Sequence, residues 1–208
     1  MKLSIIIPVY NQEELIVKAL ESIPNRKGIE VIIVDDHSTD NTVNVIKEWR
    51  KHSRVRYDVK LLLNEKRVGV GRARNKALDI AIGDYIFCLD SDDYIITDKF
   101  SEAMDQLDAD IVYIDLEIND GTVMRLSEDT KYGYCSFIDK FVRASFWGKS
   151  KFSDAKAGSD YTLNSELQHK PHSERYTHIV AYHYNYPREN SNFDLLIKGK
   201  LDEIQYEE

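Results

Sequence analysis

The chain has 208 residues, of which 42% are hydrophobic and 31% are charged, a composition typical of soluble globular proteins. This length fits one compact domain with one core and one active cleft, so we expect residues 1–208 to form a single domain. The formal net charge of −8 argues against tight, unspecific DNA binding, because that attraction comes mainly from Lys and Arg side chains that neutralise phosphates.

Strands and helices are predicted to alternate in the first half of the chain. Helical spacing of apolar residues predicts a helix over 12–23 with Asn11 as its N-cap, a second across 43–49, and a third over 72–82 that Gly83 ends. Apolar runs predict the strands between them: Leu3–Val9, Val31–Val34, Val59–Leu63 and the run from Tyr85 that ends in Asp90-Ser91-Asp92-Asp93. This alternation implies right-handed crossovers and a mostly parallel sheet with helices on both faces.

The second half of the chain is less regular and should add a small antiparallel part. Asn119-Asp120-Gly121 is typical of a hairpin turn. The remaining predicted elements are a helix over 98–107, strands over 110–116 and 122–126, helices over 135–146 and 159–167, a strand over 177–184, and a terminal helix within 193–208.

Polar clusters follow three of the predicted strands, at 8–11, 35–38 and 90–93. Ligands of open parallel sheets bind at the carboxyl ends of the strands, so these clusters should converge on one crevice. Carboxylates such as those of Asp90, Asp92 and Asp93 are ligands that Mg²⁺ or Mn²⁺ accepts, usually together with a substrate phosphate. The residues alone leave open whether they bind a metal or end a strand in a solvated loop.

Two further patterns have alternative interpretations. Asp35 and Asp36 suit either the crevice or the cap of the following helix. The Gly69-Val70-Gly71 turn before Arg72 and Arg74 suits a diphosphate site, although an arginine face in solvent is the simpler interpretation. The histidines show no zinc spacing, and the sequence contains neither a Walker loop nor a Gly-x-Ser-x-Gly elbow.

Five segments in a fixed order carry a resemblance to a known family: I-I-I-P-V-Y-N at 5–11, V-D-D-H-S-T-D at 34–40, G-R-A-R-N at 71–75, L-D-S-D-D at 89–93 and G-S-D-Y at 158–161. With them the chain resembles the inverting family 2 nucleotide-sugar glycosyltransferases of the GT-A fold. The resemblance implies an α/β, Rossmann-like sheet. Residues 1–115 would form the half that binds the nucleotide sugar, and 116–208 the half that binds the acceptor.

The resemblance also implies roles at the donor site. Pro8, Val9 and Tyr10 would line the base pocket, and Asp36 would accept a hydrogen bond from the imide N–H of uracil or its equivalent. Arg74 would lie near the nucleotide.

Asp90-Ser91-Asp92 would be the family's D-x-D motif. In that motif Asp92 coordinates Mn²⁺ or Mg²⁺, and Asp90 faces the ribose or the surroundings of the metal. Asp93 is expected to have a structural role, capping or bracing the turn that follows.

By the same resemblance, Asp160 would be the base that takes the proton from the acceptor hydroxyl, with Asp154 or Glu166 as a second choice. An N-cap of its own helix is the alternative role for Asp160. The family often has a second acid where this chain has Ser159. We also expect Arg188 to clamp the diphosphate from a loop, and His183 either to approach the metal or to pack within its strand.

The expected function is transfer of a sugar from a nucleoside-diphosphate donor, taken to be UDP, to a hydroxyl on a glycan, a lipid-linked saccharide or a similar acceptor (EC 2.4 class). One alternative is transfer to hydroxylated DNA bases, which the net charge disfavours; a second is a non-catalytic nucleotide-sugar binding module. A homo-oligomer is possible. The basic patch for the DNA alternative would come from Arg50, Lys51, Arg54 and Arg56.

Two cysteines, Cys88 and Cys135, cannot form a framework of several disulfides, which favours a reducing compartment. The apolar run that ends at Pro8 is too short for a signal sequence or a membrane span, and no other segment is long enough. We therefore expect a cytoplasmic protein without a membrane span.

Overall fold

The structure is a computed structural model that describes residues 1–127, 136–154 and 159–187. The elements in chain order are β1 (Leu3–Val9), α1 (Ile16–Ser22), β2 (Ile29–Asp35), α2 (Thr42–His52), β3 (Asp58–Leu63), α3 (Val70–Leu78), β4 (Tyr85–Cys88), β5 (Tyr94–Ile95), α4 (Thr97–Met104), β6 (Ile111–Ile118), β7 (Val123–Met124), β8 (Lys140–Arg143), α5 (Ala144–Trp147), α6 (Ser159–Gln168) and β9 (Glu174–Tyr184).

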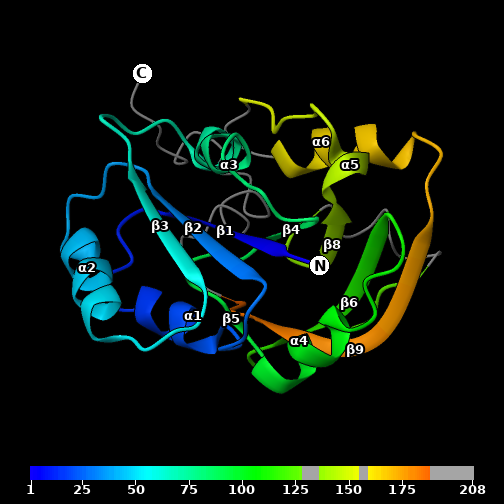
Figure 1. The fold of residues 1–208 in the computed structure, drawn as a ribbon, viewed down its shortest axis with the longest axis horizontal. Helices are drawn as coiled ribbons and strands as arrows, with labels where there is room; N and C mark the ends of the chain where they lie inside the picture. Colours follow the sequence, from blue (N-terminus) through cyan, green and yellow to red (C-terminus); the bar gives the residue numbers. More distant parts are fainter. Residues whose placement is uncertain (128–135, 155–158, 188–208) are drawn as a thin grey trace.

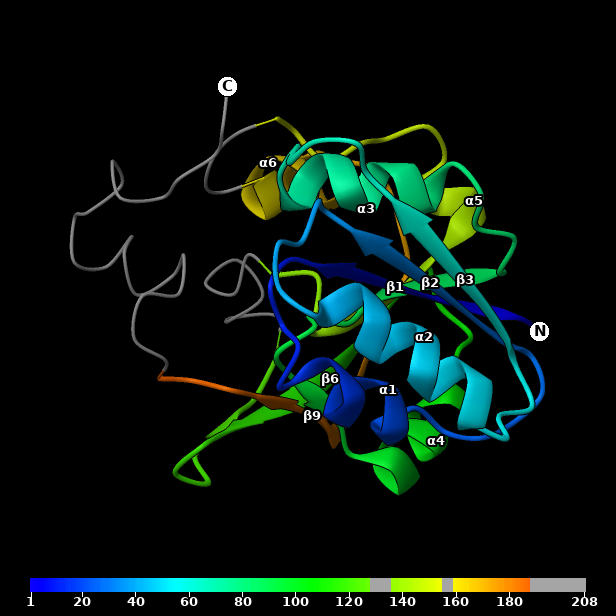
Figure 2. The same ribbon diagram turned by 90° about the vertical axis from the view of Figure 1, so that its left-hand side faces the viewer.

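All strands belong to one sheet with the order β3-β2-β1-β4-β8-β6-β9-β5, and β7 pairs with β6. The strands β3, β2, β1 and β4 pair in parallel, whereas β8 joins β4 and β6 antiparallel. Helices α1, α2 and α4 lie on one face of the sheet and α3, α5 and α6 on the other (Figures 1 and 2). The predicted α/β class with helices on both faces is confirmed.

Burial on both faces explains why the central strands are continuous apolar runs. Every residue of β1 and β2 is buried. Alternate side chains supply two cores: Ile5 and Ile7 pack with the layer of α1, α2 and α4, while Ile6 packs with the layer of α3, α5 and α6.

The sheet opens where β1 and β4 separate. β1 pairs with β2 over its whole length, but with β4 only from Leu3 to Ile6. Pro8, which has no N–H to donate, lies beyond the last pair with β4. Because β1, β2 and β4 are parallel, their carboxyl ends lie at one edge of the sheet, and the predicted site residues Tyr10, Asp36 and Asp90 follow these ends.

The helix predicted over 135–146 is wrong for the residues that the structure describes. Lys140–Arg143 is strand β8, and only Ala144–Trp147 is helical. Phe141 and Val142 enter the two opposite cores, which is the period of two expected of a strand. The spacing of Phe137, Ile138, Phe141 and Val142 also fits a helix, so tertiary pairing decided between the two.

Smaller predictions also need correction. The first helix begins at Ile16 rather than at residue 12, and Asn11 is not its N-cap: Asn11 has φ +49° and accepts a hydrogen bond from Thr39 N (2.8 Å). Helix α3 ends at Leu78, so Gly83 does not end it. The predicted helix within 193–208 and Cys135 lie outside the described residues.

Candidate functional site

The loops after β1 and β2 contact each other at the carboxyl edge of the sheet. Asn11 N donates to Ser38 Oγ (3.0 Å), and Asp36 N donates to the carbonyl of Val9 (2.8 Å). The predicted meeting of these two polar clusters is confirmed.

Asp36 holds the loop that leads into α3. Its Oδ1 accepts hydrogen bonds from Asn64 Nδ2 (2.9 Å) and Val68 N (2.8 Å), and its Oδ2 accepts one from Gly69 N (2.7 Å). Asp35 instead braces its own turn, since its Oδ2 accepts from Ser38 N (3.1 Å). Its buried Oδ1 has no hydrogen-bond partner in the described part of the chain. Neither acid is the N-cap of α2, which is Asn41.

The loop held by Asp36 reaches back to Tyr10. The guanidinium carbon of Arg67 lies 3.8 Å from the centroid of the Tyr10 ring, a cation–π contact. Neither Asn64 nor Arg67 was predicted as a site residue. Asn64 directly follows β3, so its place at the carboxyl end of a strand was an available signal.

Arg74 joins the two acids predicted for opposite sides of the reaction. Its Nη2 donates to Asp90 Oδ1 (2.7 Å) and its Nη1 to Asp160 Oδ1 (2.5 Å). The Arg74 side chain is only 4% exposed, against 31% for Asp90 and 22% for Asp160. Burial alone would lower the pKa of Arg74, but the charges of Asp160 and Asp90 outweigh burial and raise it. The structure thus brings Arg74, Asp90 and Asp160 together from three separate elements.

Asp93 has the structural role predicted for it. Its Oδ2 accepts a hydrogen bond from Tyr182 OH (2.6 Å) and its Oδ1 accepts one from Asn185 N (2.8 Å). Burial and the nearby charge of Asp90 raise the pKa of Asp93 to about 7. The Tyr182 hydroxyl also accepts from Asp90 N (3.2 Å), so β9 braces the turn that carries the D-x-D motif.

The acids of the motif fit a divalent ion only together with a phosphorylated ligand. Ser91 is buried, whereas Asp90 and Asp92 are partly exposed at the edge of the sheet. Among the described residues no group of three or more His, Cys, Asp or Glu side chains is arranged to hold a metal. Two carboxylates leave most coordination positions to phosphate oxygens and water, an arrangement that Mg²⁺ commonly adopts.

His183 packs within its strand, as one of the two predictions for it stated. Its Nδ1 lies 3.1 Å from Glu117 Oε1 and its Nε2 lies 3.0 Å from Asn119 Oδ1, while its ring stacks on Tyr94 at 4.2 Å. Both ring nitrogens therefore face partners on and next to β6.

The alternative bases contact surface residues instead. Asp154 pairs with Arg72 (2.9 Å), and Glu166 accepts from Ser150 Oγ (2.6 Å) and pairs with Lys170 (3.0 Å). Arg188, the predicted clamp of the diphosphate, lies outside the described residues.

The basic patch of the DNA alternative is exposed at the end of α2 and in the loop that follows. Because α2 leads from the carboxyl end of β2 back to the start of the parallel strand β3, this patch lies toward the edge opposite Asp36 and Asp90 (Figure 2). This placement does not support the DNA alternative.

A cavity of about 740 Å³ lies between α1 and α2, away from the acids. Leu20, Val45, Trp49 and Tyr57 contribute to its lining, and none of the predicted site residues does. In the described part of the chain, no helix has the length and apolar character needed to cross a membrane.

Comparison with known proteins agrees with this arrangement. The sequence profile of glycosyl transferase family 2 matches residues 4–155. A poly(ribitol-phosphate) beta-glucosyltransferase of Bacillus spizizenii is 41% identical over 99 residues, which is 46% of this chain and 15% of that relative. The UDP-Glc:alpha-D-GlcNAc-diphosphoundecaprenol beta-1,3-glucosyltransferase WfaP of Escherichia coli is 33% identical over 195 residues, which is 87% of this chain and 76% of that relative.

Among solved structures, S. aureus TarS in complex with UDP-GlcNAc superposes with a TM-score of 0.76 at 24% identity. The superposition covers 92% of this chain and 60% of the TarS chain, so the two share a fold, which is the predicted GT-A fold. The profile match and the likeness to the E. coli enzyme extend over most of the sequence. The chain therefore belongs to glycosyl transferase family 2.

Proposed function

We propose that the chain catalyses inverting, metal-dependent transfer of a sugar from a UDP-sugar to an acceptor hydroxyl. The observation that supports this most is the position of Arg74, which contacts Asp90 of the D-x-D motif and Asp160 at once. In this proposal the uracil ring of the donor lies against Pro8, Val9 and Tyr10, and its imide N–H faces Asp36. Ser91 and Arg188 are proposed to contact the diphosphate.

The proposed reaction needs no covalent intermediate on the protein. Asp160 accepts the proton of the acceptor hydroxyl, whose oxygen forms a bond to the anomeric carbon from the face opposite the diphosphate. The bond from that carbon to the diphosphate oxygen breaks, and UDP leaves with the electron pair. Asp90 and Asp92 would hold Mn²⁺ or Mg²⁺, which would supply positive charge to neutralise the diphosphate. Arg74 orients Asp160 and adds positive charge beside the same site.

The names of the relatives support the choice of donor and acceptor class. The E. coli relative, which aligns with 87% of this chain, is named for a UDP-glucose donor and a diphosphoundecaprenol-linked acceptor. We propose a UDP-sugar donor and a glycan or lipid-linked saccharide as acceptor for this chain.

Donor consumption with a panel of acceptors in the presence of Mn²⁺ tests the proposal. Asp92→Ala should lose turnover, whereas Thr162→Ala, an exposed change on the same helix as Asp160, should keep it. Unchanged turnover in Asp92→Ala would show that the metal role is assigned wrongly. Tight UDP binding by the unaltered chain without product from any acceptor would instead identify a binding module.

A further inference from the structure

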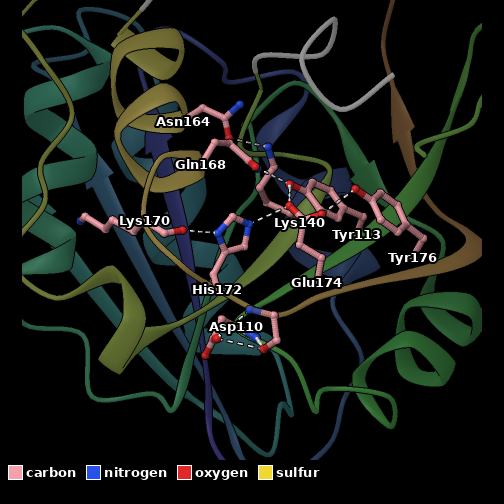
Figure 3. A network of polar contacts seen from close by, with 10 residues as sticks. Asp110, Tyr113, Lys140, Asn164, Gln168, Lys170, His172, Glu174 and Tyr176 are labelled. Atoms are coloured by element: carbon pink, nitrogen blue, oxygen red, sulfur yellow. Dashed lines mark hydrogen bonds and ion pairs between the residues drawn. The ribbon is translucent and has the colours of Figure 1, made fainter. Parts of the chain in front are cut away.

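Helix α6, which carries Asp160, has an inward polar side chain at every fourth position. Asp160 accepts from Arg74 of α3, and Asn164 Oδ1 accepts from Lys140 Nζ of β8 at 3.0 Å. One turn further, Gln168 Nε2 donates to the hydroxyl of Tyr113 in β6. Residues four apart share one face of a helix, so three polar contacts from three elements hold one face of α6. Figure 3 shows the contacts of Asn164 and Gln168.

The middle contact comes from an unusual residue. Lys140 is 1% exposed and lies in a strand between β4 and β6. Its Nζ lies 3.0 Å from Asp139 Oδ1 and a little over 5 Å from the ring centres of Tyr113 and Phe137. Lysine side chains are almost never buried to this extent, because removing the ammonium group from water costs free energy that other interactions must offset.

Stability of the fold is a weak reason for this buried pair. The cost of removing two charges from water often exceeds their attraction, and apolar residues of similar volume usually serve a fold as well. Apart from the ion pair with Lys140, neither carboxylate oxygen of Asp139 accepts a hydrogen bond from another of the described residues. Asp160 also contributes to the raised pKa of Asp139, which indicates that the two carboxylates lie close enough to interact.

We propose that Lys140 is a positioning residue for Asp160. Lys140 donates a hydrogen bond to Asn164, one helical turn after Asp160. This hydrogen bond fixes the rotation of α6 about its axis and its position along the sheet. That placement keeps Asp160 against Arg74 and beside the donor site. The apolar contacts of α6, through Leu163 and Leu167, are less directional and allow the helix to shift by a fraction of a turn. This inference rests on the proposed function, since it assumes that Asp160 is the base.

Variants on both sides of the contact test the proposal. Asn164→Ala removes the acceptor for Lys140, Asn164→Asp keeps an acceptor oxygen, and Thr162→Ala is an exposed control on α6. The double variant Asp139→Asn with Lys140→Met removes both charges of the pair, since Lys140→Met alone leaves a buried carboxylate unpaired and is expected to impair folding.

The measured quantities are kcat, KM for the donor, Kd for UDP with Mn²⁺, and hydrogen–deuterium exchange of the α6 amides. Asn164→Ala and the double variant should lower kcat by about tenfold to a hundredfold, with KM and Kd close to those of the unaltered chain, because small displacements of a catalytic group have effects of this size. Exchange in α6 should rise in both, and Asn164→Asp should restore most of the lost kcat.

The proposal is overturned if Asn164→Ala and the folded double variant keep kcat within about twofold of the Thr162→Ala control. It is also overturned if kcat falls but UDP binding weakens in proportion, since that pattern indicates general loss of structure. Absence of transfer by the unaltered chain with every acceptor would instead count against the proposed function, and the α6 exchange data alone would then decide whether Lys140 holds the helix.

Discussion

At the scale of single residues, Arg72 and Arg74 of α3 differ in burial and in the ion pairs that they form. Arg74 is buried and contacts two carboxylates, whereas the Arg72 side chain is 54% exposed and pairs with an Asp154 side chain that is 62% exposed. Removing one partner of a buried ion pair leaves an uncompensated charge, while exposed pairs contribute little.

We therefore expect Arg74→Met to lower the free energy of unfolding by about 3–5 kcal/mol and Arg72→Met to lower it much less. Urea unfolding of both variants measures the difference, and because the two positions share a helix, loss of helix propensity affects them alike. Equal losses of unfolding free energy in the two variants would show that Arg74 does not stabilise the fold by compensating the charges of Asp90 and Asp160.

Asp139 predicts a pH dependence of stability. Burial raises its folded-state pKa to about 6 from the ordinary value of 3.8, while Lys140 lowers this pKa and Asp160 raises it further. Between these two values the folded chain binds more protons than the unfolded chain, so the contribution of Asp139 to stability is present at low pH and is lost as pH rises through about 6.

The advantage in unfolding free energy of the unaltered chain over Asp139→Asn should therefore fall by the order of 2 kcal/mol between about pH 4 and about pH 7. Denaturant unfolding at several pH values measures this difference, and the contributions of other titrating groups, such as Asp93, cancel in it. A difference that is flat or increases with pH would contradict the assignment.

The sequence could predict candidate residues that directly follow a strand or belong to a family motif, such as Asp36, Asp90 and Asp160, and the structure joins Asp90 and Asp160 through Arg74. Asn64, Lys140 and Asn164 escaped prediction because their importance depends on the partner that each one meets in the folded chain. Nothing in the local pattern around Lys140 indicates that its ammonium lies against a helix that begins nineteen residues later.

At the scale of elements, the parallel half of the sheet was predicted well because burial on both faces leaves a clear apolar run. Strand β8 was missed because four residues are too few to establish a period, and their apolar spacing also fits a helix. Its place between β4 and β6 is set by long-range pairing, which no local pattern encodes.

The start of β4 depends on close packing against β1 at Gly83. A Cβ atom at this position would lie 2.5 Å from Ser4 N and 2.7 Å from the carbonyl oxygen of Tyr85, both of them backbone atoms. Gly121 has φ +82° but open space around it, so a Cβ there meets only the cost of its backbone conformation.

Gly83→Ala should therefore lower the free energy of unfolding by about 3 kcal/mol and Gly121→Ala by about 1 kcal/mol. The thermal unfolding midpoint should fall more in Gly83→Ala than in Gly121→Ala. Differential scanning calorimetry of both variants tests this expectation. An equal or smaller loss at Gly83 would mean that β1 and β4 can separate without cost at this point.

At the scale of the whole molecule, the fold gathers its acids and its buried arginine at one edge of the sheet. Tyr10, Asp36 and Asp90 follow the parallel strands β1, β2 and β4, and Asp160 is joined to Asp90 through Arg74. The matched region covers 15% of the length of one relative and 76% of another.

We propose that this edge of the sheet, and not the cavity between α1 and α2, binds the donor. A crystal structure with UDP and Mn²⁺ tests this placement. We expect the uracil to lie against Tyr10 with its imide facing Asp36, the ion to lie between the diphosphate and Asp92, and Asp160 to lie on the acceptor side of the same site. A nucleotide bound in the cavity lined by Trp49 and Tyr57, or an ion without contact to Asp90 or Asp92, would contradict it.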